Sequence, residues 1–334
     1  MLQDRGRLFS RGLRCWPGSA QHSLLPDPTL NSRRPYVLLR QGRLGATSLF
    51  CRSNEEPTLP LTLATWNINS VRLRLPLVRR FLGEYQPDIL CLQETKCPDG
   101  QFPTADIRAM GYEHIEINGQ KGYHGVAILS RLPISEVDRG SFCRHGHSRY
   151  MAVTLAEGAG SAAGLTVHNF YVPAGGDEPD PAVNEKFDHK LHFLDGMIDA
   201  AAKGTLKTQR AILVGDLNVA PLETDVWSHK ALLSVVSHTP VEVERFGRVM
   251  RAGAWVDAMR QRIPAEEKLF TWWSYRSPDW VAANKGRRLD HIWVSEDLGA
   301  AVIDMRVIKE ARGWERPSDH VPVIATLTTS REAP

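Results

Sequence analysis

From Leu59 onward, short apolar runs of strand length alternate with segments of helical periodicity, and this alternation constrains the fold more than any other feature of the sequence. The helical segments, at 77–85 and 184–203, carry their apolar side chains along one face. No repeat or low-complexity break interrupts the pattern up to residue 330. We therefore expect an α/β fold of stacked, paired sheets with helices outside. The predicted strands are 61–68, 88–93, 126–129, 165–171, 211–214, 291–294 and 321–327.

The first 57 residues differ in composition from the rest of the chain. Residues 1–54 contain nine Arg, no Lys and two Asp, a formal charge of +7, while the whole 334-residue chain carries only +3. The remaining residues are therefore acidic, at −4, so the net charge is no evidence that the folded part binds nucleic acid. We expect residues 1–57 to be a disordered Arg-rich extension, either a mitochondrial transit peptide or a spurious upstream start, and residues 58–330 to form one large domain.

Two classes of protein are excluded by the sequence. It contains no apolar run that approaches the roughly 18 residues of a transmembrane helix. Its five cysteines are odd in number, and Cys91 lies in an apolar run, which suits a reducing compartment better than a disulfide framework. The sequence shows neither a Cys-x-x-Cys pair nor a zinc-type Cys/His spacing, and the pair His145 and His147 lacks nearby carboxylates. We therefore expect no metal at that pair.

Polar side chains directly follow several of the apolar runs. Asn67 and Asn69 end the first predicted strand on one face, and Glu94 ends the second. Asp216 and Asn218 follow the run 211–214 and project to the same side if the backbone stays extended. Each has a structural alternative, since Asn and Asp are common turn formers and a strand-end Glu is often a solvated charge. Their recurrence at strand ends, where α/β folds expose side chains to ligands, favours a shared site.

Two further acids and one histidine extend this pattern. Asp290 opens an apolar strand, and the pair Asp319-His320 precedes another. A lone His is usually structural or exposed. Among carboxylates, however, a His can bond or protonate a phosphoryl oxygen while a carboxylate holds its other ring nitrogen. Asp290 is the candidate for that carboxylate partner of His320.

Six short motifs identify a family that this chain resembles: Trp66-Asn67, Gln93-Glu94-Thr95-Lys96, Tyr171-Val172-Pro173, Gly215-Asp216-Leu217-Asn218, Leu289-Asp290 and Ser318-Asp319-His320. Their order and spacing over about residues 61–328 resemble those of the exonuclease III-like AP endonucleases, within the endonuclease/exonuclease/phosphatase superfamily. The resemblance implies a four-layer α/β sandwich of two packed mixed sheets flanked by helices. It also implies Mg²⁺ dependence, with Mn²⁺ as an alternative, and cleavage of double-stranded DNA at abasic sites or from 3′ ends in base excision repair.

The resemblance also implies a role for each matched residue. The implied metal ligands are Glu94, Asn69, Asp216, Asn218, Asp319 and His320. The implied catalytic residues are Tyr171, Asp216, Asn218, Asp290 and His320. Position 69 is usually an acid or another polar residue in the family, and the amide found here is a weaker Mg²⁺ ligand than a carboxylate. Both Asp216, oriented by Asn67, and the His320–Asp290 pair are able to deprotonate the attacking water, and the sequence leaves this choice open.

The segment 271–288 interleaves aromatic and basic residues, and we expect it to face DNA. Arg and Lys neutralise phosphates, while a Trp can stack on a base or fill the space around an extruded sugar. The alternative is a Trp-rich edge of the core with solvated Arg, and at least one of Trp272 and Trp273 should be partly core. Together with the matched motifs, this segment gives the predicted substrate-binding residues Asn67, Lys96, Trp272, Trp280, Arg287 and Arg288.

Three functions are compatible with these residues. The first is a DNA repair nuclease. The second is a phosphatase of the same fold acting on a lipid or inositol headgroup, which the basic, Trp-bearing segment 271–288 disfavours. The third is a catalytically silent nucleic-acid-binding scaffold, which would not require the catalytic positions to be occupied. We expect a monomer with no membrane partner, in the bacterial cytoplasm at the nucleoid, or in mitochondria if residues 1–57 are a transit peptide.

Overall fold

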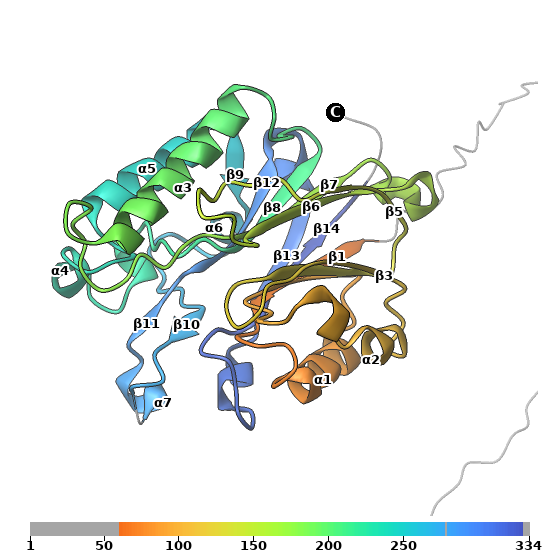
Figure 1. Ribbon diagram of the computed structural model, residues 1–334, viewed down its shortest axis with the longest axis horizontal. Coiled ribbons are helices and arrows are strands. Elements are labelled where there is room, and N and C mark those ends of the chain that lie inside the picture. The colour runs from red at the N-terminus through yellow and green to blue at the C-terminus, as the bar shows by residue number, and fades with distance from the viewer. Residues whose placement is uncertain (1–59, 278, 330–334) are drawn as a thin grey trace, which may run out of the picture. The chain divides into compact units, whose positions relative to one another are not determined.

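Two six-stranded mixed sheets form the framework of the part of the chain that the computed structural model describes, residues 60–277 and 279–329 (Figure 1). The extension predicted over residues 1–57 lies outside these residues. The first sheet has the order β13 (Val302–Val307), β14 (Val323–Leu327), β1 (Leu61–Asn67), β2 (Ile89–Gln93), β4 (Val126–Ser130) and β3 (His114–Asn118). The second has the order β5 (Ile134–Asp138), β6 (Tyr150–Leu155), β7 (Thr166–Tyr171), β8 (Ala211–Asp216), β12 (Asp290–Ser295) and β9 (Trp255–Asp257).

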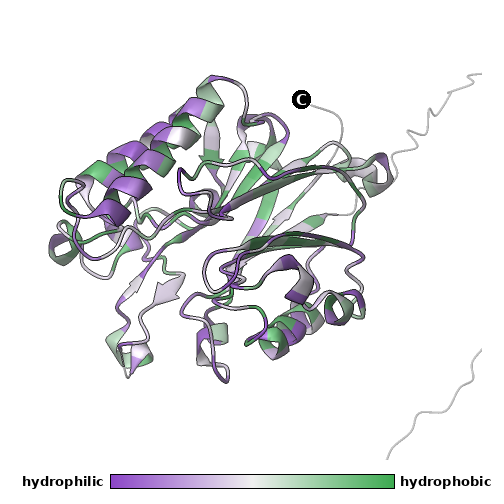
Figure 2. Ribbon diagram, in the orientation of Figure 1, coloured by the Kyte–Doolittle hydropathy of each residue, from purple (hydrophilic) through white to green (hydrophobic). Residues whose placement is uncertain are grey.

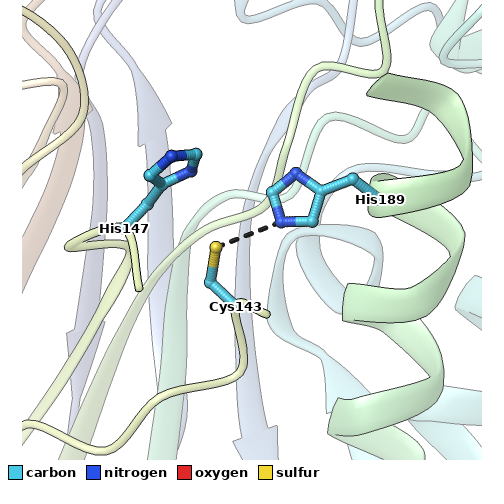
Figure 3. A group of neighbouring side chains, drawn as sticks. All are labelled: Cys143, His147 and His189. Carbon is cyan, nitrogen blue, oxygen red and sulfur yellow. Dashed lines mark hydrogen bonds between the residues drawn. The ribbon is translucent and has the colours of Figure 1, made fainter. Parts of the chain in front are cut away.

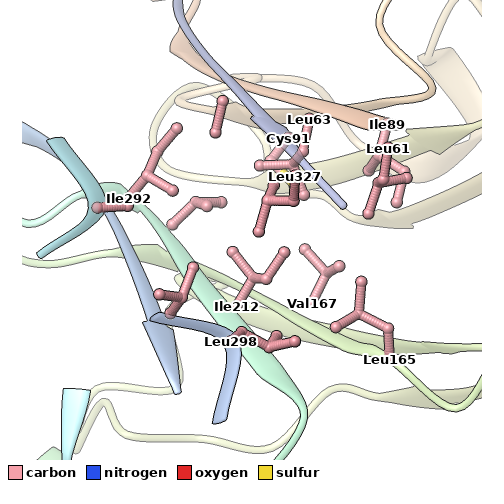
Figure 4. Packing of buried hydrophobic residues seen from close by; sticks show 14 of the residues in the cluster. Leu61, Leu63, Ile89, Cys91, Leu165, Val167, Ile212, Ile292, Leu298 and Leu327 are labelled. Carbon is pink, nitrogen blue, oxygen red and sulfur yellow. The ribbon is translucent and has the colours of Figure 1, made fainter. Parts of the chain in front are cut away.

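The sheets pack face to face because their side chains alternate between two apolar environments. Along β1, Leu63 points between the sheets, whereas Trp66 lies on the outer face under the helices. Figure 4 shows Leu63 and Cys91 of the first sheet opposite Ile212 and Val167 of the second. Each such buried aliphatic side chain contributes about 1.5–3 kcal/mol. This buried apolar layer therefore holds the two sheets together.

Helices cover the outer face of each sheet and complete four layers (Figure 1). Helices α1 (Leu75–Tyr85) and α2 (Thr104–Arg108) pack on the first sheet, where the rings of Phe81 and Trp66 lie 5.6 Å apart. Helices α3 (Glu185–Ala202) and α5 (Pro240–Ala252) pack on the second sheet through buried Phe193 and Phe246. In Figure 2 the strands between the helices are mostly hydrophobic, while α3 and α5 mix hydrophobic and hydrophilic residues. The four-layer α/β sandwich predicted from the sequence is confirmed.

Local sequence signals account for the ends of several elements. Helix α5 begins after Thr239, whose hydroxyl accepts from the Glu242 N–H while the Glu242 carboxylate accepts from the Thr239 N–H. Strand β14 begins two residues later than expected, at Val323, because Pro322 has no N–H to donate to a neighbouring strand. The short helices are α4 (His229–Leu232), α6 (Ala258–Arg262) and α7 (Trp280–Ala283). Among the described residues, no helix combines the length and the apolar character that crossing a bilayer requires.

One edge of the two sheets collects the ends of the strands that carry the sequence motifs. The parallel pairs β1–β2 and β7–β8 place Asn67 beside Gln93 and Tyr171 beside Asp216. Strand β12 is antiparallel to β8, so its first residue, Asp290, is the register partner of Asp216. A two-stranded ribbon of β10 (Trp272–Trp273) and β11 (Gly286–Arg287) adjoins this edge through a bridge between Trp272 and His320. The sheet topology thus brings distant motifs together.

Candidate active site

Five polar side chains from distant parts of the chain line one cavity of about 750 Å³ at this edge. They are Glu94, Asp216, Asn218, Asp319 and His320. Three of them, Asp216, Asn218 and His320, are buried. Burying a charged side chain costs free energy, so the gathering of these buried polar side chains in one cavity wall indicates a functional site.

Asn67, the last residue of β1, links the carboxylates of the two sheets. Its Nδ2 donates to Glu94 Oε1 at 3.0 Å and to Asp216 Oδ2 at 2.8 Å, and its Oδ1 accepts from the Asn69 N–H. The side chain is fully buried and lies behind the cavity wall. We therefore correct its predicted assignment as a substrate-binding residue, because an amide with all of these partners orients the two carboxylates and has no group left for a ligand.

His320 lies between two carboxylates. Its Nδ1 donates to Asp290 Oδ2 at 2.8 Å, and its Nε2 lies 3.7 Å from Asp216 Oδ2. Asp290 is fully buried, and its N–H donates to the hydroxyl of Thr271. Atoms of Asp216, Asp290 and His320 lie within 4.8 Å of one another. The contact with Asp290 holds the imidazole so that Nε2 faces the cavity side of the group.

The protonation of this group follows from its burial and its charges. Burial raises the pKa of Asp216 to about 7, with the charge of Asp290 adding to the rise and that of His320 opposing it. Burial alone would lower the pKa of His320, but the carboxylates of Asp290 and Asp216 raise it to about 10. Near neutral pH the imidazole is therefore a cation that donates hydrogen bonds, and Asp216 exchanges a proton readily. Because Nδ1 donates to Asp290, only Nε2 of His320 is left for the metal role predicted for this residue.

Glu94 lies just beyond β2 and is held in its ionised form. Its Oε1 accepts from Tyr171 OH at 2.8 Å, and its Oε2 pairs with Lys96 Nζ at 2.8 Å. Burial alone would raise the pKa of Glu94, but the Lys96 charge and the hydrogen bonds from Asn67 and Lys96 bring it below its usual value. Burial also raises the pKa of Tyr171 well above its usual value, so the phenol keeps its proton and donates it to Glu94.

Asp319 is positioned by a chain of hydrogen bonds that begins at Lys96. Lys96 Nζ donates to Asn69 Oδ1 at 2.6 Å, and Asn69 Nδ2 donates to Asp319 Oδ1 at 3.0 Å. The indole N–H of Trp272 donates to Asp319 Oδ2 at 3.0 Å. Asn69 thus uses its oxygen for Lys96 and its amino group for Asp319. In this arrangement Asn69 orients a carboxylate and offers no oxygen to a metal.

The backbone of the site adopts conformations that the sequence pattern does not reveal. Glu94 and Asn218 have φ of 50° and 54°, in the left-handed region that non-glycine residues seldom occupy. The chain therefore turns after Asp216 and does not stay extended, and the Asn218 N–H donates to Asp216 Oδ1 at 3.1 Å. Just before this turn, Gly215 has φ of 138°, and a Cβ there would lie 1.9 Å from the Phe170 carbonyl oxygen. Glycine at 215 is thus required by close packing of β8 on β7.

The oxygen donors of the site fit a hard divalent cation. Glu94 and Asp319 contribute carboxylates to the cavity wall, and carboxylate oxygen is the ligand that Mg²⁺ and Mn²⁺ prefer. The Lys96 ammonium, bound between Glu94 and Asn69, shows that positive charge is stabilised at this corner of the site. Glu94 and Asp319 are therefore the residues that would hold a metal.

The aromatic and basic segment forms one side of the cavity, but its members differ in position. Trp272 and Arg287 line the cavity, and the Arg287 guanidinium lies 5.3 Å from the Trp272 ring. Trp273 is a core residue, in agreement with the expectation that one of the two tryptophans is buried. Trp280 packs on Trp273 at 5.3 Å between ring centroids and is not part of the cavity wall. Its predicted contact with substrate has no support from this position.

Arg288 is buried and does not line the cavity, so its position does not support the predicted contact with substrate. Its side chain is fully buried and forms ion pairs with Asp225 at 3.0 Å and with Asp257 at 2.8 Å. The reason is the alternation of side chains along an extended backbone: Arg287 points to the cavity and Arg288 points to the opposite side. Arg288 therefore anchors the ribbon that carries Trp272 and Arg287.

Arg288→Met is expected to lower the free energy of unfolding by about 3 kcal/mol, because it removes the cation of partly buried Asp257 and one of the two cations of buried Asp225, which keeps Arg260. Urea unfolding followed by tryptophan fluorescence measures the change. The matched control is Arg287→Met, which should weaken DNA binding and lower stability less than Arg288→Met, since half-buried Arg287 loses hydrogen bonds to Val236 O and Ser237 Oγ but leaves no carboxylate unpaired. Equal losses of stability in the two variants would contradict the assignment.

Two residues next to the site, Lys190 and Glu242, were not predicted from the sequence. Lys190 of α3 is fully buried, donates to the Asn218 carbonyl oxygen at 2.7 Å and forms an ion pair with buried Glu242. This pair supports the turn that carries Asn218. One signal was available: Lys190 lies three residues after Phe187, on the apolar face of its helix, where a lysine requires a buried partner.

Comparison with known proteins agrees with this geometry. Residues 64–320 match the model of the Endonuclease/Exonuclease/phosphatase family. The chain is 31% identical over 267 residues to an exodeoxyribonuclease III of Haemophilus influenzae, a match that covers 78% of this chain and 97% of that protein. It resembles the structure of an AP endonuclease from Archaeoglobus fulgidus, with 33% identity and a TM-score of 0.73, over 80% of this chain and 99% of that one. A 3′ phosphatase from Neisseria, bound to a product DNA hairpin, is similar at 33% identity and a TM-score of 0.71, with the same coverage. The chain therefore belongs to the endonuclease/exonuclease/phosphatase family, as an exodeoxyribonuclease III-like member.

Proposed function

We propose that this phosphodiester-hydrolysing nuclease cuts double-stranded DNA at abasic sites or acts at lesions of DNA 3′ ends, and that its metal is Mg²⁺. The observation that carries the proposal is the convergence of Glu94, Asp216 and His320 on one cavity. Phosphodiester hydrolysis requires a positioned water, positive charge near the phosphoryl oxygens and assistance to the leaving oxygen. Asp216 and His320 are the candidates for the first two requirements, and Glu94 is a candidate ligand for the metal that serves the third.

Asp216 is the group that we assign to the attacking water. Asn67 and the Asn218 N–H hold its carboxylate, so that an oxygen keeps a fixed direction while it orients the water and accepts its proton. His320, kept cationic by Asp290, donates its Nε2–H to a phosphoryl oxygen and stabilises the charge that develops there. This arrangement favours Asp216 over the His320–Asp290 pair as the base, because a protonated imidazole has no free electron pair to accept a proton.

The remaining positive charge would come from the metal ion and from the basic side chains of the cavity wall. Glu94 and Asp319 would hold the Mg²⁺ ion, which when bound polarises a phosphate oxygen and stabilises the leaving 3′ alkoxide. Tyr171 keeps its proton and orients Glu94. Arg276, Lys285 and Arg287 line the cavity on the Trp272 side, where they would neutralise phosphates of the bound strand.

The proposal is tested by incubating the purified protein with a duplex that carries one abasic-site analogue, with Mg²⁺ and with EDTA. Incision on the 5′ side of the lesion in Mg²⁺ alone is expected. The same duplex without the lesion, a duplex with a 3′-phosphate and a soluble inositol phosphate serve as competing substrates. Faster phosphate release from the inositol compound than cleavage of either damaged DNA would contradict the proposal, and so would binding of DNA without turnover.

Binding of Mg²⁺ is expected to release a proton at pH 6.5 and to release much less at pH 8. Because burial raises the pKa of Asp216 to about 7, the carboxyl is largely protonated at pH 6.5, and a nearby cation expels the proton. At pH 8 the carboxylate is already ionised. Calorimetric titration with Mg²⁺ in two buffers of different ionisation enthalpy measures the number of protons. Asp216→Asn should abolish the difference between the two pH values, and a persisting difference would assign the proton to another group.

We also propose that the chain acts as a monomer in the bacterial cytoplasm. The support for the location is that the relative from Haemophilus influenzae is a bacterial exodeoxyribonuclease, and the monomer stays an expectation. A mitochondrial location would require residues 1–57 to be a transit peptide. The mass of the native polypeptide shows whether residues 1–57 are retained, and its sedimentation coefficient shows whether it is a monomer.

A further inference from the structure

Cys143, His147 and His189 form a second cluster of potential metal ligands (Figure 3). Cys143 and His147 lie in the loop 139–149 between β5 and β6, and His189 lies in the first turns of α3. One ligand atom from each of the three lies within 4.8 Å of the other two, and Cys143 Sγ is 3.1 Å from His189 Nε2. A tetrahedral zinc site, with Zn–S of about 2.3 Å and Zn–N of about 2.0–2.1 Å, places sulfur and nitrogen about 3.5 Å apart. The observed distance between Cys143 Sγ and His189 Nε2 is therefore close to that of a zinc site, and the distances to His147 stay within 4.8 Å.

One buried nitrogen of the cluster, His147 Nδ1, lacks a hydrogen-bond partner among the described residues. A neutral imidazole with a free lone pair is the form that binds a metal, and an unpartnered buried nitrogen requires an explanation. A metal supplies that explanation.

We propose that Cys143, His147 and His189 bind a zinc ion at a site separate from the acidic cleft. A thiolate and two imidazoles are ligands that zinc accepts and that Mg²⁺ does not. None of the three lines the acidic cavity, which instead offers carboxylate oxygen to its metal. The fourth position is open to water or to His145, whose ring centroid lies 4.5 Å from that of His189. Cys143 also lines a second cavity, of about 680 Å³, through which an ion can enter.

The sequence did not indicate this site because its ligands are divided between a loop and a helix. Cys143 and His147 are four residues apart, whereas His189 follows more than forty residues later, which matches no zinc motif of regular spacing. The expectation of no metal at His145 and His147 rested on the lack of carboxylates. Zinc does not require them when a cysteine is present. The proposed ion would fasten the loop 139–149 to α3, and this loop ends at Arg149, whose guanidinium lies over the Tyr171 ring at 4.5 Å.

The test uses the full chain, stripped with chelator, incubated with Zn²⁺ in a large excess of Mg²⁺ and then dialysed. The excess Mg²⁺ occupies the carboxylate site, so that retained zinc reports the new one. Elemental analysis is expected to find one zinc per chain in the wild type and almost none in Cys143→Ser or His189→Gln. Their zinc affinity should fall by more than about 100-fold, since even loss of an outer-shell partner reduces metal affinity by 10–100-fold. The matched controls are Cys97→Ser, at another buried thiol, and His192→Gln, at an exposed position of the same helix.

A second measurement does not depend on the folding of any variant. Titration of the stripped wild type with Co²⁺ should produce a sulfur-to-cobalt charge-transfer band in the near ultraviolet, which Zn²⁺ then abolishes. Zinc should also raise the melting temperature of the wild type and leave that of Cys143→Ser unchanged. Absence of both retained zinc and the charge-transfer band in the wild type would overturn the proposal, and so would equal zinc retention in Cys143→Ser.

Discussion

Asp216→Asn is expected to lower kcat on an abasic-site duplex by about 10²- to 10⁴-fold, which is the usual contribution of a general base. Asparagine has nearly the shape of aspartate, but its amide cannot accept a proton from the attacking water. The hydrogen bond from the Asn218 N–H to Oδ1 can persist, so the turn that follows β8 should be retained. Single-turnover kinetics with saturating enzyme measures the chemical step directly.

The affinity for DNA separates this explanation from a general loss of structure. The basic residues that line the cavity, Arg276, Lys285 and Arg287, are retained in this variant, so the dissociation constant for duplex should change little. The control is Asp195→Asn, which removes a surface ion pair with Arg245 remote from the cavity. Retention of more than about a tenth of the wild-type kcat in Asp216→Asn would show that Asp216 is not the base.

Glu94→Gln is expected to lower activity by at least about 100-fold at limiting Mg²⁺ and to raise the Mg²⁺ concentration required for half-maximal rate. Glutamine keeps an oxygen that can accept from Asn67 and Tyr171, but it removes the negative charge that attracts the metal and pairs with Lys96. The rate is measured across a Mg²⁺ series. Part of the loss should be recovered at high Mg²⁺, because a weaker ligand shifts the binding equilibrium without removing the cavity.

The matched control for this variant is Glu116→Gln, which breaks an ion pair with Arg139 on the first sheet. That variant should have a Mg²⁺ dependence equal to that of the wild type. An unchanged Mg²⁺ dependence in Glu94→Gln, with or without a loss of rate, would place the metal on other ligands.

The strands with continuous apolar runs could be predicted from the sequence, whereas the edge strands could not. Strand β2 reads Ile89-Leu90-Cys91-Leu92 because it is buried on both faces, and its ends were predicted within one residue. Strand β5 (Ile134–Asp138) lies at a sheet edge, and most of its side chains are half-buried or exposed. Its sequence, Ile-Ser-Glu-Val-Asp, is too polar and too short to be distinguished from a loop. Tertiary pairing with β6 makes it a strand.

The positions of candidate site residues could be predicted where these residues end buried strands, but not where they depend on packing between layers. Asp216 and Asp290 follow from strand ends, and the antiparallel register places them side by side. The burial of Arg288 depends instead on Asp225 and Asp257, which come from other parts of the chain. No local pattern distinguishes Arg288 from Arg287. The periodicity of a single sequence carries no information about such long-range charge pairs.

A crystal structure of the protein with Mn²⁺ and a duplex that contains a non-cleavable abasic-site linkage, with anomalous scattering used to locate the metal, tests the proposed site directly. An anomalous peak bound by Glu94 is expected, with one phosphate held between Asn218, His320 and that ion. A metal bound elsewhere, or a scissile phosphate out of reach of Asp216 and His320, would contradict the proposed site.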